Sequence, residues 1–94
     1  MDSLDSKSVR LTATGTVKAG RGRITGIYAI TTASAGSLIF RDGGASGTIV
    51  LQIDTPANNN QIIDISLESR RILCSTDIHC TVTNVASAVV FYDG

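Results

Sequence analysis

Apolar side chains recur at every second position along most of this chain. The clearest example is the segment 48–54, in which Ile49, Leu51 and Ile53 alternate with polar residues. A period of two places alternate side chains on opposite faces of a β-strand, whereas an amphipathic helix requires a period near 3.6. The pattern therefore predicts strands that direct one face to a core.

Seven further segments share this pattern, and Gly, Ser, Asp and Asn residues separate them. The predicted strands are 9–18, 23–32, 38–41, 48–54, 61–67, 71–74, 78–83 and 88–92, and the clearest turn is DGGASG at 42–47. About eight short strands spaced roughly eight to twelve residues apart indicate an all-β, antiparallel β-sandwich or jelly roll. A short helix is an alternative only at 67–73.

The polar, Ser- and Asp-rich segment 1–8 differs from the rest and is expected to form a flexible N-terminal arm. Residues 9–94 then form a single β-sandwich domain. Apolar residues on the inward side of the alternating strands are predicted to face the core: Ile49, Leu51, Ile53, Ile63, Ile65 and Val82.

The composition allows a core but a small one. The chain has 94 residues, 43% of them hydrophobic, with 4% aromatic residues and no Trp. A chain of this size buries only about 64% of its unfolded surface, and aliphatic core positions each contribute less burial than Phe or Trp. We therefore expect a homo-oligomer or a protein stabilised by docking on a partner.

The charges and the N-terminal sequence exclude several classes of partner. Eight Lys and Arg residues balance eight Asp and Glu residues, so no net field attracts nucleic acid or an anionic membrane. Residues 1–6 lack the features of a signal peptide, and no apolar run is long enough for a membrane span. We expect synthesis in the cytosol without secretion by the ordinary route.

Cys74, His79 and Cys80 are the residues most suggestive of a metal site. Strand parity places Cys74 and Cys80 with the inward residues and His79 on the opposite face, so one ion cannot easily bind all three. We expect two buried thiols and no metal, with a disulfide as the alternative, and we expect His79 to be solvated.

No catalytic arrangement is present, and we expect a protein that is not an enzyme and binds no cofactor. His79 is the only His, and no G-x-S-x-G elbow accompanies it. The acidic residues lie mostly at predicted turns, where a carboxylate caps backbone N–H groups. A calcium site is a remote alternative, formed by Asp54, Asn58, Asn60 and Asp64, whose spacing matches no known loop.

Two basic turns are the candidate contact sites for a partner. Lys18, Arg21 and Arg23 form the first, and Arg70 and Arg71 form the second. Each could bind an acidic surface, although solvated turn charges are the alternative for each residue.

Much of the chain after residue 8 resembles small virion proteins of tailed bacteriophages. The similar segments are LTATGTVK (11–18), GIY (26–28), SAG (34–36), LIFRDGGASGT (38–48), Ile72 and TVTNVASAVVFY (81–92). The resemblance implies a β-sandwich that binds neighbouring subunits in the particle, as a head decoration or cement protein or as a neck or tail component. It implies no catalytic residues, and it makes phage capsid or other virion proteins the expected partners and the virion the expected location.

A carbohydrate- or receptor-binding module of a tail or fibre is the alternative function. Such a module needs exposed aromatic side chains. The chain offers only Tyr28, Phe40, Phe91 and Tyr92, and most of these are expected inside. An enzyme ranks third.

Overall fold

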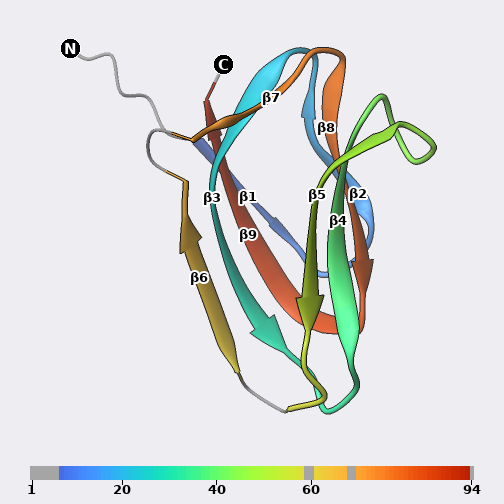
Figure 1. Cartoon of the computed structure of the whole chain (residues 1–94), viewed down its shortest axis with the longest axis vertical. Coiled ribbons are helices and arrows are strands. Elements are labelled where there is room, and N and C mark those ends of the chain that lie inside the picture. The colour runs from blue at the N-terminus through green and yellow to red at the C-terminus, as the bar shows by residue number, and fades with distance from the viewer. Residues whose placement is uncertain (1–6, 59–60, 68–69, 94) are drawn as a thin grey trace.

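The computed structural model describes residues 7–58, 61–67 and 70–93, whose regular secondary structure consists of nine antiparallel strands (Figure 1). The strands are β1 (Lys7–Leu11), β2 (Gly15–Ala19), β3 (Gly22–Thr31), β4 (Gly36–Asp42), β5 (Thr48–Thr55), β6 (Ile62–Ser66), β7 (Ile72–Cys74), β8 (Asp77–Thr83) and β9 (Val85–Asp93). The all-β prediction is confirmed. In the described part of the chain, no helix is long and apolar enough to cross a membrane.

The strands form two packed sheets. Sheet A has the order β1-β9-β3-β6, with β7 also beside β3, and sheet B has the order β2-β8-β4-β5. Apart from the short β7, the first strand pairs with the last, the second with the one before the last, and so on toward the middle of the chain. The pairs are β1·β9, β2·β8, β3·β6 and β4·β5. This nesting is that of a jelly roll, so the predicted sandwich has jelly-roll order.

The first predicted strand is two strands in the structure. β1 belongs to sheet A and β2 to sheet B, and residues 12–14 carry the chain from one sheet to the other. Thr14 helps to fix this crossing, because its hydroxyl accepts a hydrogen bond of 3.0 Å from the backbone N–H of Val82.

The N-terminal boundary of the sheet lies earlier than expected. Lys7 and Ser8, assigned to the arm by composition, are part of β1 and pair with Tyr92 and Phe91. Residues 1–6 of the expected arm lie outside the described residues.

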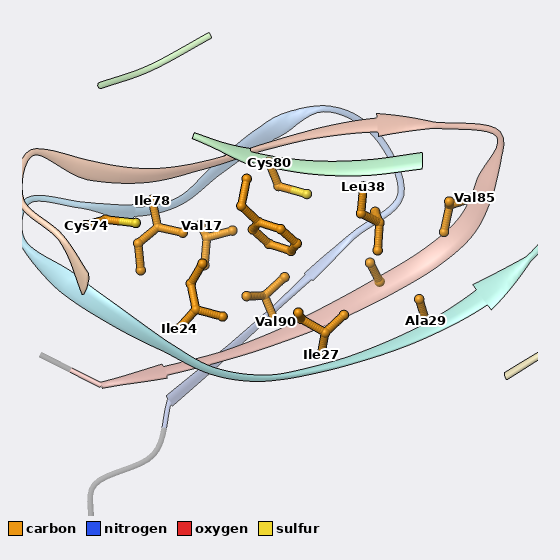
Figure 2. Close-up of a cluster of buried hydrophobic side chains, with 12 residues drawn as sticks. Val17, Ile24, Ile27, Ala29, Leu38, Cys74, Ile78, Cys80, Val85 and Val90 are labelled. Atoms are coloured by element: carbon orange, nitrogen blue, oxygen red, sulfur yellow. The ribbon is translucent and has the colours of Figure 1, made fainter. Parts of the chain in front are cut away.

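The core lies between the two sheets and is mostly aliphatic. Figure 2 shows Ile27 and Val90 of sheet A directed toward Leu38 and Cys80 of sheet B. Phe40 is the largest fully buried side chain. The buried apolar residues are Val17, Ile24, Ile27, Ala29, Leu38, Phe40, Cys74, Ile78, Cys80, Val85, Ala88 and Val90.

Most of the residues predicted to face the core lie beside it. Leu51, Ile53, Ile63 and Val82 are half-buried and pack against the buried cluster, and Ile65 is half-buried.

The prediction for Ile49 was wrong, because Ile49 is 48% exposed. Phe40 pairs with Leu51 and Arg41 pairs with Ile49, so Val50 is the extra residue of a β-bulge. The bulge reverses the alternation, and Val50 packs against the core in place of Ile49.

Candidate functional site

The outer face of sheet A, the side turned away from sheet B, carries most of the exposed large apolar side chains. Five such residues occur in the described part of the chain, and four of them lie on this face: Tyr28 (37% exposed), Ile62 (60%), Leu73 (41%) and Phe91 (38%). The fifth, Ile49, lies on the outer face of sheet B. No third layer of described chain covers either face (Figure 1).

The strand register shows why these residues point outward. Ile27 and Val90 are paired and buried, so the residues on either side of each in sequence face away from the core. Three rows of side chains cross the outer face: Ser8–Phe91–Gly26–Ser66, Arg10–Val89–Tyr28–Asp64 and Ser87–Ile30–Ile62. In the first two rows an apolar centre lies between charged or polar ends, and the third row ends on the apolar Ile62 of β6.

A hollow of about 370 Å³ opens on this face at Gly26. A Cβ at Gly26 would lie 3.5 Å from Cδ2 of Phe91 and 3.1 Å from the carbonyl oxygen of Ile65, so the Phe91 ring leans across the glycine. The hollow is lined by Thr25, Gly26, Asp64, Ile65, Ser66, Arg71 and Phe91. Its lining residues therefore include one aromatic side chain, one carboxylate, two hydroxyls and one guanidinium group.

An ion pair fixes Arg71 beside this hollow. Its Nη1 donates to Oδ2 of Asp93 over 2.9 Å, and the two side chains are 43% and 26% exposed. A pair this exposed contributes roughly 0–1 kcal/mol to folding. The pair holds Arg71 at the hollow, which Phe91 also lines.

The structure brings the two predicted basic turns to the same end of the sandwich. β7 pairs with the start of β3, which places Leu73 opposite Arg23 and the second basic turn beside the first. Arg23 also lies opposite Asp93. Of the others, Lys18 is half-buried and its Nζ donates to the carbonyl oxygen of Ala19 over 3.3 Å, while Arg21 and Arg70 are exposed.

Sequence reasoning missed the apolar outer face, although a signal was present. The β3 segment has apolar residues on both faces, Ile27 and Ala29 on one and Tyr28 and Ile30 on the other. Apolar residues on both faces of this segment suggest a central strand of a sheet. In the structure β3 is central within its sheet, yet only one of its faces is covered.

Cys74 and Cys80 are buried free thiols, as predicted. Burial raises the pKa of the Cys80 thiol to about 12. Burial, with smaller contributions from the charges of Asp42 and Asp77, raises the pKa of Cys74 to about 11. Both side chains are therefore protonated at neutral pH.

His79 lies on the opposite face of β8 from these thiols, but the expectation of a solvated side chain was wrong. It is only 8% exposed. β8 is an inner strand of sheet B, and His79 lies between Thr16 of β2 and Arg41 of β4. Neighbours on both sides therefore limit its contact with water.

The described residues bring together no group of three His, Cys, Asp or Glu side chains that could hold a metal ion. The candidate ligands of the alternative calcium site do not come together either. Asp54 lies on the outer face of sheet B, and Asp64 lies on the outer face of sheet A. Asn60 lies outside the described residues.

No protein-family model, curated protein or solved structure matches the chain. Jelly rolls occur both in viral capsid proteins and in lectins, so the fold is compatible with subunit adhesion and with sugar binding. A shared fold does not distinguish subunit adhesion from sugar binding. The distinction has to come from the chemistry of the outer face of sheet A.

Proposed function

We propose that this chain is a non-enzymatic structural protein of a phage virion that binds neighbouring subunits and stabilises or decorates the capsid. The observation that carries the proposal is the collection of Tyr28, Ile62, Leu73 and Phe91 on one uncovered sheet face. The outer face of sheet A is the adhesive surface. The chain assembles into the virion in the host cytoplasm.

The chemistry of this face fits a protein interface. Contiguous exposed apolar side chains mark interaction sites, since their burial contributes about 25 cal/mol per Å². Interfaces typically combine an apolar, aromatic centre with a polar rim. Here Phe91 and Tyr28 are central, and Arg10 and Asp64 lie on the two outer strands of the sheet.

The core supports a function in many copies. Phe40 is the only aromatic residue in the buried cluster, and the other members are aliphatic residues or Cys. A chain with a core this poor in aromatic residues gains stability from anything that binds only its folded state, including identical neighbours.

The test is reconstitution on phage particles produced with the coding sequence of this chain deleted. Purified wild-type protein is expected to bind to a saturating number of copies, counted by gel densitometry. Phe91→Ser with Ile62→Ser is expected to weaken binding about tenfold or more, because it removes a central and an outer apolar side chain of this face.

Ile49→Ser is the matched control, because it removes the exposed apolar residue of the other sheet. It is expected to bind as the wild type does. Absence of wild-type binding to any part of the particle would contradict the proposal. Equal binding by the wild type, the double variant and Ile49→Ser would mean that the outer face of sheet A is not the adhesive surface.

Sugar or receptor binding is the second candidate, favoured by one specific observation. Tyr28 and Phe91 are both exposed on the outer face, and Asp64, Ser66 and Arg71 line the hollow beside Phe91. Aromatic faces with nearby polar groups that fix orientation suit a small polar ligand. Glycan-array binding by the isolated protein that is lost in Phe91→Ala would favour this function over adhesion.

A further inference from the structure

We propose that the outer face of sheet A binds a second copy of this chain, in a two-fold dimer whose axis runs parallel to the strands between β3 and β9. This inference rests on the proposed adhesive function and names its first partner. In such a dimer the same face of both copies is buried, and every contact between two residues occurs twice.

The two-fold axis determines which residues meet. It lies in the plane of the interface, so it places β1 of one copy over β6 of the other and β9 over β3. The central row runs Arg10, Val89, Tyr28 and Asp64 across these four strands. Arg10 therefore faces Asp64 of the second copy, and Val89 faces Tyr28.

The charges at the ends of this row are available to an external partner. Arg10 and Asp64 are both exposed, and neither forms an ion pair within the described residues. Three strand spacings of about 4.8 Å separate them, roughly 14 Å, which exceeds the screening length at physiological salt. A second copy would pair each charge with its opposite.

The neighbouring row has a complementary centre. Phe91 of β9 pairs with Gly26 of β3, and the Phe91 ring leans over the glycine toward the axis. The two copies of this ring would meet there, in an aromatic contact flanked by Ser8 and Ser66 at the polar ends of the row.

A second copy fits this face better than a partner of a single charge sign. An acidic partner would place like charge against Asp64, and a basic partner would place like charge against Arg10. The two-fold arrangement pairs each of the two residues with an opposite charge. The chain has a formal net charge of zero, so no long-range repulsion keeps two copies apart.

The experiment is sedimentation equilibrium of the purified full chain, compared with two charge reversals. The wild type is expected to dimerise. Arg10→Glu and Asp64→Arg each place two like-charged pairs in the interface and are expected to raise the dimer Kd about tenfold or more. Mixed in equal amounts, the two variants are expected to form a mixed dimer, because both of its charged pairs are again opposite in sign.

Asp54→Arg makes the same charge change on the outer face of sheet B and is the control, expected to dimerise like the wild type. A monomeric wild type, or a mixture that associates no better than the separate variants, would overturn the inference. The reconstitution on particles remains a separate measurement, so a monomer that still binds particles would contradict the dimer and leave the adhesive function standing. A monomer that binds glycans through Phe91 would contradict the dimer and favour sugar binding.

Discussion

Asp42 ends β4 and Asp77 begins β8, and each carboxylate accepts hydrogen bonds from the backbone of the turn next to the other residue. Asp77 Oδ1 accepts the N–H groups of Gly43 and Gly44 at 2.9 and 3.0 Å. Asp42 accepts those of Ser75 and Thr76 at 2.9 and 2.8 Å. The φ angles of Gly43 and Gly44, 112° and 83°, are accessible to glycine at little cost and turn these N–H groups toward Asp77. The two carboxylates thus join the β4–β5 and β7–β8 turns.

Acid is expected to weaken this connection. Hydrogen bonds from Ser75 and Thr76 hold the pKa of Asp42 below its usual 3.8. A depressed folded-state pKa adds stability that is present above the unfolded-state pKa and is lost as the pH falls through the folded-state value. Wild-type stability should therefore fall below about pH 4. Asp42→Asn should be less stable at neutral pH, and the difference should narrow in acid.

Urea unfolding followed by circular dichroism across this pH range provides the measurement. Asp54→Asn is the control, because Asp54 is exposed on the outer face of sheet B and belongs to neither turn. A constant difference between the wild type and Asp42→Asn down to the lowest pH would contradict the role of the ionised carboxylate.

The register and burial of β4 and β5 predict an unequal response to two truncations. Leu38→Ala removes a fully buried side chain and should cost about 2–5 kcal/mol of unfolding free energy. Ile49→Ala removes an exposed side chain and should cost less than about 0.5 kcal/mol. Chemical denaturation of both variants tests the register, and a large cost for Ile49→Ala would mean that the bulge is misplaced.

The two thiols are expected to be inert in the folded protein. Their pKa values of about 11 and about 12 leave little thiolate at neutral pH, and both side chains are buried. A maleimide should label neither Cys74 nor Cys80 in the native state and both after unfolding in guanidinium chloride, as counted by mass spectrometry. Rapid native labelling, or a mass that rises by two hydrogens on reduction, would contradict this.

The clustered basic turns are expected to contribute to particle binding through charge. Arg21→Glu with Arg23→Glu should leave the circular dichroism spectrum unchanged and reduce occupancy on deletion particles. The reduction should be larger at low salt, where charges are least screened. Wild-type occupancy of the double variant at every salt concentration would remove Arg21 and Arg23 from the contact surface.

The sequence predicts the positions of the strands better than it predicts which side chains of each strand face the core. Alternation locates the strands because burial between two sheets imposes a period of two, as at Leu51 and Ile53. It fails at Ile49, because a bulge shifts the parity without any local signal. It also fails at residues 9–18, where the chain changes sheets within one continuous pattern.

The candidate surface could be predicted only in part. The basic residues Arg23 and Arg71 are visible in the sequence, but their proximity depends on the pairing of β7 with β3. The exposure of Tyr28 and Phe91 depends on which face of sheet A lacks a cover, a property of the tertiary fold. Most of the four aromatic side chains were expected inside, but Phe40 is the only one of them that is fully buried.

A cryo-EM map of the intact particle tests the central claim most directly. The proposed function predicts density for this chain at many symmetry-related positions, with Phe91 and Tyr28 of each copy buried against a neighbouring subunit. A map in which the chain occupies no position, or in which the outer face of sheet A is turned to solvent in every copy, would contradict it.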